Sequence, residues 1–211
     1  MSVRPLEIDD RRAVLDQLRG RIDALQGGPS RLSVPVPSVL EGLARLRTGG
    51  VYAVDSASLA MVLASGASAA GDWVGFVGWD DFGVEAAAQL GIALGRTVLV
   101  PTPGEHWLEV VAALVDVLRI VVLRPAGRID PRSASVVQAR LRSRDAVLLV
   151  HGERGTQGAW PQADATFSAT EVAWDGVGRG SGRLHGQRAR VVVREVGRPN
   201  SREIVLPYAA R

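Results

Sequence analysis

Short apolar runs alternate with helix-forming segments through the middle of the chain. The apolar runs span residues 51–54, 73–77, 97–100, 120–123 and 147–150, and helical patterns over residues 59–68, 83–90, 105–118 and 131–144 lie between them. Strands that are apolar on both faces and alternate with helices are typical of a parallel sheet covered by helices on both sides. The pattern therefore predicts an α/β fold with a mostly parallel sheet.

The pattern changes after residue 152. Residues 165–173, 187–195 and 203–206 have the composition of strands, and glycine-rich turns separate them without any helical spacing. These segments predict an antiparallel extension at the edge of the sheet. The glycine and arginine run 176–183 lies between two of these strands and is expected to be a hairpin loop.

The amino-terminal segment predicts one amphipathic helix over residues 7–26. Its apolar stripe consists of Leu15, Leu18, Ile22 and Leu25. Residues 27–30 (Gly-Gly-Pro-Ser) end the helix, so residues 1–30 are predicted to be a helix with a linker and residues 31–211 the main domain. A helix of this length is only marginally stable alone. The stripe is therefore expected to dock on a partner, on a second copy of the chain, or back on its own sheet. A further short helix is expected over residues 40–47.

Composition and length favour a soluble globular protein. The chain has 211 residues, of which 46% are hydrophobic and 22% charged. The amino terminus lacks the apolar segment of a signal peptide, and Asp116 and Arg119 interrupt the longest apolar stretch, so a cytoplasmic protein that does not cross a membrane is expected. There is no cysteine, and the three histidines lie in separate segments, so no metal site is expected.

All 25 basic residues are arginines, and charge is distributed unevenly along the chain. Residues 48–118 contain eight acids and one base, whereas residues 176–211 contain eight arginines and two acids. Side chains alternate along a strand, so three arginines of the 187–195 strand share one face, and Val191 and Val193 point to the other. The sequence suggests a partner-binding surface that comprises Arg179, Arg183, Arg188, Arg190 and Arg194. A protein partner or weak nonspecific DNA contact fits this surface, and a solvated face is the alternative.

Residues 50–125 resemble the core of the RecA superfamily, and in particular its small actinobacterial ImuA-type (ImuA-prime-like) relatives. The most specific segments are ASGASAAGDWVGFVG and EAAAQLGIALGRTVLVPTPG. The resemblance implies a RecA-like core and a role as an accessory protein of SOS-induced error-prone translesion DNA synthesis. Its implied partners are an ImuB-like Y-family polymerase homologue and an error-prone replicative-type polymerase. A SulA-type cell-division inhibitor, which shares a degenerate RecA-like core, is the alternative, and an active RecA-like ATPase comes third.

Two positions depart from the pattern of a RecA-type ATPase. A phosphate-binding loop requires several glycines and a lysine, but the turn after the first strand contains only Asp55, Ser56, Ala57 and Ser58, and the chain has no lysine. Arg124 stands where a Walker B carboxylate would hold Mg²⁺. We therefore expect a non-catalytic protein that binds no nucleotide cofactor. Asp80 and Asp81, near the position of a catalytic glutamate, are expected to cap the helix that follows Gly83.

Overall fold

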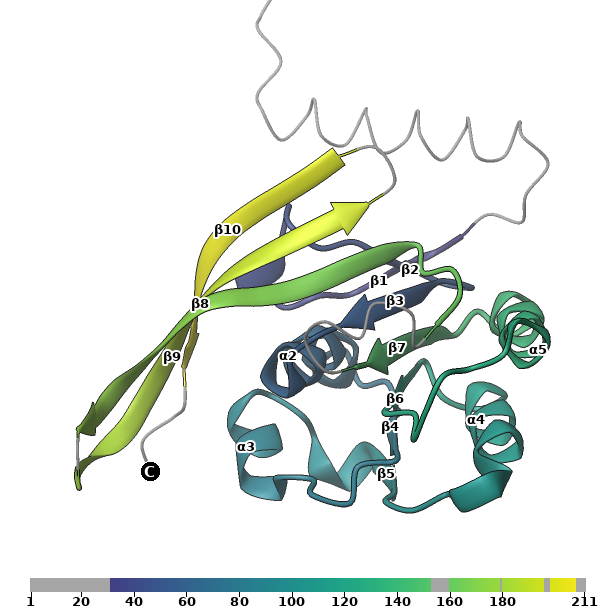
Figure 1. Cartoon of the computed structure of the whole chain (residues 1–211), viewed down its shortest axis with the longest axis horizontal. Helices are drawn as coiled ribbons and strands as arrows, with labels where there is room; N and C mark the ends of the chain where they lie inside the picture. The colour runs from purple at the N-terminus through teal and green to yellow at the C-terminus, as the bar shows by residue number, and fades with distance from the viewer. Residues whose placement is uncertain (1–30, 153–159, 179, 196–197, 208–211) are drawn as a thin grey trace, which may run out of the picture. The chain divides into compact units, whose positions relative to one another are not determined.

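The computed structural model describes residues 31–152, 160–178, 180–195 and 198–207 (Figure 1). The chain divides into two compact units, Met1–Leu32 and Ser33–Arg211. Apart from Arg31 and Leu32, every described residue belongs to the second unit. The predicted amino-terminal helix and its apolar stripe (Leu15, Leu18, Ile22 and Leu25) lie outside the described residues.

The second unit is built on an eight-stranded sheet in the order β10-β9-β8-β3-β7-β6-β4-β5. The six neighbouring strands β8, β3, β7, β6, β4 and β5 run parallel to one another. Strand β9 runs antiparallel to β8, and β10 runs antiparallel to β9. This confirms the predicted α/β fold with a mostly parallel sheet and antiparallel carboxy-terminal strands. The bounds are β3 Val51–Val54, β4 Val74–Val77, β5 Thr97–Val100, β6 Ile120–Leu123, β7 Val147–His151, β8 Ala165–Gly178, β9 Ser181–Glu195 and β10 Arg198–Pro207.

One detail of the predicted extension is wrong. We expected its first strand to pair antiparallel, but β8 pairs in parallel with β3, with Tyr52 opposite Ala165. Asp164, just before β8, lies at the start of β3: its N–H donates to the Val51 carbonyl, and its carboxylate accepts from the Val51 N–H. The antiparallel part therefore begins at β9.

Helices cover both faces of the sheet (Figure 1). One core cluster packs α2 and α3 against the sheet, and a second packs α4 and α5 against the opposite face. The bounds are α2 Ala57–Ala69, α3 Val84–Gln89, α4 Trp107–Val115 and α5 Pro131–Ser143, with 3-10 turns η1 Ser38–Leu40, η2 Leu94–Arg96 and η3 Gly104–His106. No helix among the described residues is long and apolar enough to cross a bilayer.

The expected helix over residues 40–47 is wrong. The segment forms η1 and then a small sheet in which β1 (Ser33–Val34) pairs with β2 (Leu46–Arg47). The chain just before this segment packs closely on α2 at Gly66, where a Cβ atom would lie 2.4 Å from the Pro35 carbonyl oxygen. Gly42, with a φ of 73°, turns the chain where a helix would have continued.

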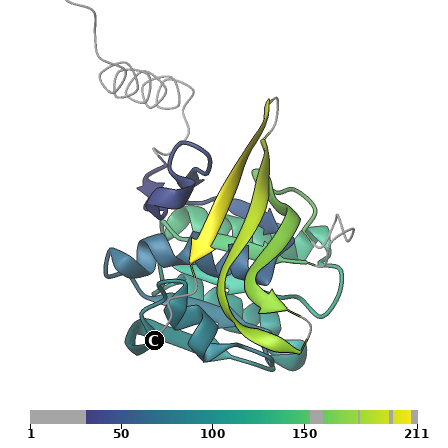
Figure 2. The ribbon, with the colours of Figure 1, turned by 90° about the vertical axis from the view of Figure 1, so that its left-hand side faces the viewer.

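The three carboxy-terminal strands are longer than predicted. β8 and β9 form a hairpin that continues through most of the glycine-rich run 176–183, and β10 lies beside β9 (Figure 2). Register shifts interrupt the hairpin, and Glu171 has a φ of 51° at the first of them. Such a bulge bends and twists a strand. Glycine in this run therefore did not mark a loop.

Candidate functional site

The turn between β3 and α2 stands at the position predicted for a phosphate-binding loop. The Asp55 carboxylate accepts a hydrogen bond from the Ala169 N–H of β8 at 2.8 Å. Ser56 is the N-cap of α2, and its hydroxyl accepts from the Leu59 N–H. The helix starts at the next residue, so Ala57 and Ser58 belong to its first turn. The Asp55 carboxylate thus links β3 to β8, and its negative charge would repel a phosphate placed at this turn.

Arg124 follows β6 and lies beside the end of β4. Its N–H donates to the Val77 carbonyl at 2.8 Å. The guanidinium group lies 4.3 Å from the centre of the Trp79 ring, which is cation–π geometry. The same group donates a hydrogen bond to Asp81 and lies 3.8 Å from the Asp80 carboxylate. The Arg124 guanidinium therefore lies between an aromatic ring and two carboxylates.

The prediction that Asp80 and Asp81 cap the following helix is wrong. The N-cap of α3 is Gly83, and no side chain caps this helix. The two carboxylates instead face Arg124, whose hydrogen bond to Asp81 holds the pKa of that carboxyl below its usual range. The reason is the strand order, which places β4 next to β6 and so brings the ends of both strands together.

Gly78 allows the ends of these two strands to approach closely. Its φ is 78°, and a Cβ atom at this position would lie 2.2 Å from the Arg124 carbonyl oxygen. The Gly78 N–H donates to the Val100 carbonyl of β5 on the other side. A residue with a side chain would be strained here, both by the positive φ and by the contact of its Cβ with the Arg124 carbonyl. The turn after β4 therefore depends on glycine to present Trp79 and the two aspartates to Arg124.

Arg124 packs against a cluster of aromatic side chains. Trp79 is 1% exposed and packs edge-on against Phe76, with ring centres 5.6 Å apart. Phe82 packs against Phe76, and the His151 ring at the end of β7 lies 5.0 Å from Trp79. The Trp79 indole N–H has no hydrogen-bond partner among the described residues. The cluster is a packed interior that fixes the end of the sheet.

The chemistry of this carboxyl edge differs from that of a Mg²⁺–nucleotide site. A metal-assisted phosphoryl-transfer site needs carboxylates free to bind Mg²⁺ and a cation free to reach the phosphates. Here Arg124 forms a hydrogen-bonded ion pair with Asp81 and lies near Asp80, so this cation is already engaged by carboxylates of its own chain. Within the described ranges there is no group of three or more histidine, aspartate or glutamate residues that could hold a metal ion.

The arginines of β9 lie on one exposed face of the strand, as predicted, but acidic side chains offset part of their positive charge. Arg188, Arg190 and Arg194 are exposed, whereas the intervening valines 191 and 193 are buried. Arg188 donates two hydrogen bonds to Asp175 at 3.0 and 3.2 Å, and Arg190 donates one to Glu171 at 2.9 Å. Acidic side chains of β8 therefore offset two of the three positive charges.

Other predicted contact residues fall elsewhere. Arg179 lies outside the described residues, and Arg183 lies within β9. Trp160 is 6% exposed and packs in the core cluster beneath α4 and α5. Trp73, just before β4, is 47% exposed.

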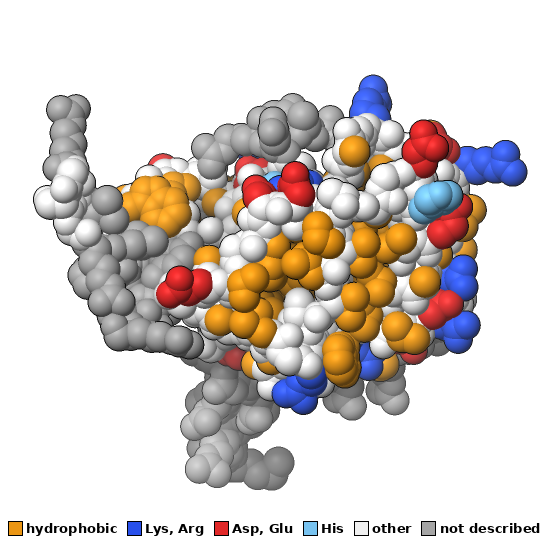
Figure 3. Space-filling view, turned by 90° about the horizontal axis from the view of Figure 1, so that it is seen from below, with side chains coloured by type: hydrophobic (Ala, Val, Ile, Leu, Met, Phe, Trp, Pro, Cys, Tyr) orange, Lys and Arg blue, Asp and Glu red, His pale blue; other side chains and the backbone are white. Residues whose placement is uncertain are grey.

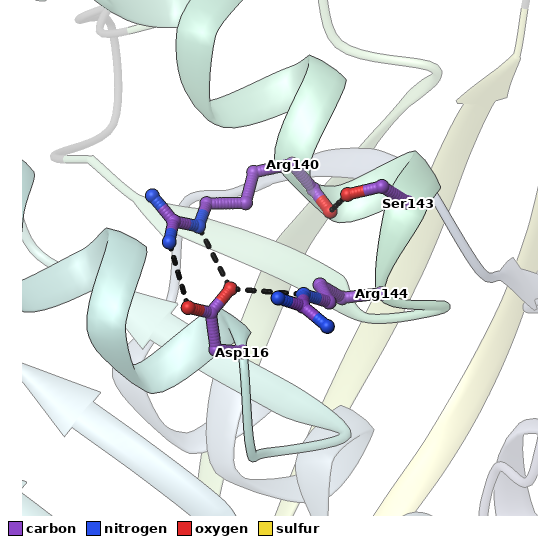
Figure 4. A network of polar contacts seen from close by, with 4 residues as sticks. All are labelled: Asp116, Arg140, Ser143 and Arg144. Atoms are coloured by element: carbon purple, nitrogen blue, oxygen red, sulfur yellow. Dashed lines mark hydrogen bonds and ion pairs between the residues drawn. The ribbon is translucent and has the colours of Figure 1, made fainter.

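A charge network between α4 and α5 was not predicted (Figure 4). Arg140 donates two hydrogen bonds of 2.7 Å to the two oxygens of Asp116, and Arg144 donates a third at 3.2 Å. These bonds lower the pKa of Asp116, and the bond to Asp116 raises the pKa of Arg140. The sequence did not indicate this pairing, because nothing in it relates the last turn of α5 to the end of α4.

Comparison with known proteins places the central sheet in a family. The MT3502 N-terminal domain matches residues 38–162, which include the strands β3 to β7 and the helices α2 to α5. The chain is also 33% identical over 178 residues to the uncharacterized protein Rv3395c of Mycobacterium tuberculosis (strain ATCC 25618 / H37Rv). That similarity covers 80% of this chain and 83% of the relative. The chain therefore belongs to the MT3502 N-terminal domain family.

Proposed function

We propose that this chain is a non-catalytic ImuA-type accessory protein of SOS-induced error-prone translesion DNA synthesis. In this proposal it has a RecA-like core and acts by binding an ImuB-like Y-family polymerase homologue. An error-prone replicative-type polymerase works with the same complex. The resemblance of residues 50–125 supports the proposal, as does a mostly parallel sheet extended by antiparallel carboxy-terminal strands.

The contacts made at the two expected nucleotide-binding positions support the proposal that the protein is non-catalytic. Asp55 in the turn after β3 bonds to the Ala169 N–H, and Arg124 after β6 pairs with Asp81. The chain has no lysine that could reach the phosphates of a nucleotide. These positions, which bind phosphate and Mg²⁺ in an ATPase, here stabilise contacts between strands.

The charges on the outer face of β9 favour a protein partner over a nucleic acid. A surface that tracks a phosphate backbone needs arginines free to neutralise phosphates. Arg188 and Arg190 already have carboxylate partners on β8, so binding a phosphate would require breaking these ion pairs. In the proposal, direct DNA binding is weak or absent.

Two measurements test the proposal. Isothermal titration with Mg-ATP should show no binding, whereas a site of micromolar affinity would favour an active ATPase. The full chain, immobilised and offered the ImuB-like protein and the cell-division GTPase of the same organism in separate pull-downs, should retain only the former. Retention of the GTPase alone would favour the SulA-type division inhibitor and overturn the proposal.

A further inference from the structure

The end of the central sheet at which its parallel strands begin lies opposite the end that carries Arg124. Four loops lie next to one another there, because they lead into the neighbouring strands β7, β6, β4 and β5. The helices α4 and α5 also end there, since β6 and β7 follow them in the chain. We call this surface the amino edge, and it comprises residues 140–146, 116–119, 71–73 and 94–96.

Large apolar side chains are exposed on the amino edge. Trp73 is 47% exposed, Val117 75% and Leu94 41%. The loops of Trp73 and Val117 are adjacent, because the Arg119 N–H donates to the Trp73 carbonyl at 3.3 Å. The amino edge forms the lower rim of the coloured surface in Figure 3, where hydrophobic and arginine side chains both reach the surface. A half-exposed tryptophan with other exposed apolar side chains nearby is typical of a surface that binds another molecule.

Arg119 holds the loops of this edge together. Its guanidinium lies 3.7 Å from the carboxylate of Asp72, the residue before Trp73, and donates to the Asp145 carbonyl at 2.8 Å. These contacts connect the loop before β6 to the loops before β4 and β7. Trp73 therefore lies on a surface that is fixed before any partner binds, and such a surface loses little conformational entropy on binding.

The amino edge carries net positive charge. Five arginines against three aspartates leave a net charge of +2: Arg96, Arg119, Arg140, Arg142 and Arg144, and Asp72, Asp116 and Asp145. Asp116 is shared by Arg140 and Arg144 (Figure 4). Arg96 and Arg142 are exposed, and neither forms an ion pair with a described residue. This charge favours an acidic partner and opposes the approach of a second copy of the same edge.

The amino edge suits a protein better than a nucleic acid. Its three aspartates lie among the arginines and would meet a phosphate backbone that followed the edge. The carboxyl ends of α4 and α5 add partial negative charge, which also opposes phosphate. Tryptophan and arginine, in contrast, are enriched among the residues that contribute most to protein–protein binding.

We propose that the amino edge binds an acidic segment of a partner protein that also carries apolar side chains. The apolar side chains of this segment pack on Trp73 and Val117. Its aspartates or glutamates meet Arg96 and Arg142, which belong to the loops at the two ends of the edge. This inference rests on the proposed function, because it assigns a surface by which the chain binds a protein of the translesion complex.

Trp73→Ala tests the inference against a matched control. The full chain is immobilised and offered the ImuB-like protein and the error-prone replicative-type polymerase of the same organism. We expect Trp73→Ala to weaken the capture of one of these proteins about tenfold or more. Trp174→Ala removes the same side chain where it is 51% exposed on β8, and should bind like the wild type.

A second pair of variants tests the same surface without removing any buried group. Val117 is 75% exposed, so Val117→Glu should leave the fold intact even if Trp73→Ala fails to fold. The added charge repels an acidic segment, and capture should again weaken about tenfold. Val136→Glu places the same charge at a half-exposed valine in the middle of α5, outside the amino edge, and should bind like the wild type.

The charge of the partner segment is tested with overlapping peptides of the same two proteins. Those peptides that the wild type retains and Trp73→Ala releases should combine aspartate or glutamate with apolar residues. Arg96→Gln with Arg142→Gln should weaken their binding about fivefold at low ionic strength and flatten its dependence on salt. Unchanged binding by this double variant would refute the acidic chemistry of the partner.

The outcomes separate the two proposals. Failure of the wild-type chain to capture either protein would overturn the proposed function. Capture by the wild type and equally by Trp73→Ala and Val117→Glu would leave that function standing and overturn the amino edge as a binding surface. Fluorescein-labelled single-stranded DNA that binds the wild type and not Trp73→Ala would identify a nucleic acid as the occupant and overturn the inference. Sedimentation that shows a wild-type dimer dissociated by Trp73→Ala would identify a second copy instead and would also overturn it.

Discussion

Removing Arg124 should destabilise the protein through the loss of its contact with Trp79. The guanidinium lies 4.3 Å from the ring centre, and the Arg124 side chain is 27% exposed, so this cation–π contact is partly desolvated. Contacts of this kind contribute about 0.5–2 kcal/mol. A fold of this size loses about 2–4 °C of melting temperature per kcal/mol. We therefore expect Arg124→Leu to lower the melting temperature by a few degrees.

A double-mutant cycle isolates the contact from the packing of each residue. Trp79 is 1% exposed, so Trp79→Ala alone should cost about 3–5 kcal/mol, mainly from the cavity it leaves. That is a large fraction of the roughly 5–15 kcal/mol by which domains are stable, so urea unfolding is best measured at low temperature. The coupling energy between Arg124→Leu and Trp79→Ala should be about 1 kcal/mol.

A matched control and a clear negative result complete this experiment. Arg128 lies four residues further along the chain, is exposed and has no ion pair with a described residue. Arg128→Leu should therefore change the free energy of unfolding by less than about 0.5 kcal/mol. If Arg124 and Trp79 prove additive within about 0.3 kcal/mol, the contact does not stabilise the end of the sheet and the reasoning is wrong.

Three further predictions follow from the structure. Gly66→Ala should destabilise the fold by about 1–3 kcal/mol, although alanine favours helices, because its Cβ would lie 2.4 Å from the Pro35 carbonyl oxygen; Gly95→Ala, with nothing within 4 Å, is the control in urea unfolding. Asp116→Asn should flatten the acid limb of a melting-temperature profile, because a lowered pKa gives stability above the carboxyl's usual pKa that is lost as the pH falls; an unchanged profile would contradict this. Arg188→Glu with Arg190→Glu should change capture of the ImuB-like protein little, because Asp175 and Glu171 already offset these two charges, and loss of capture would assign recruitment to β9.

The central strands could be predicted from the sequence because their burial leaves little choice of residue. Every residue of β6 from Ile120 to Leu123 is buried, so an apolar run of four residues marks the strand without ambiguity. The α5 start was also predictable, since Asp130 accepts from the N–H groups of Arg132 and Ser133 as an N-cap does. The segment 40–47 was not, because its backbone is set by the pairing of β2 with β1 and by burial of its side chains in the core cluster, and not by local periodicity.

The candidate site could be predicted only in part. The sequence showed that Arg124 stands where a carboxylate was expected. It did not show the partner of Arg124, because Asp81 lies 43 residues away. The two meet because β4 and β6 are neighbours in the sheet although β5 separates them in the chain. Strand order depends on how crossovers pack, and a hydrophobic pattern does not specify it. The pairing of Asp116 with Arg140, 24 residues apart on two helices, escaped prediction for the same reason.

The fold also changes the meaning of the uneven charge along the chain. Most acids of the region 48–118 meet a partner from outside their own segment or a backbone N–H, as Asp55 does on β8 and Asp116 on α5. On the basic side, Arg188 and Arg190 meet acids of β8. What the sequence presents as an acidic half and a basic half is therefore largely neutralised in three dimensions. The acids of this region without an ion pair to a described residue are Glu85, Glu105 and Glu109, so its remaining negative charge lies on α3, η3 and the first turn of α4.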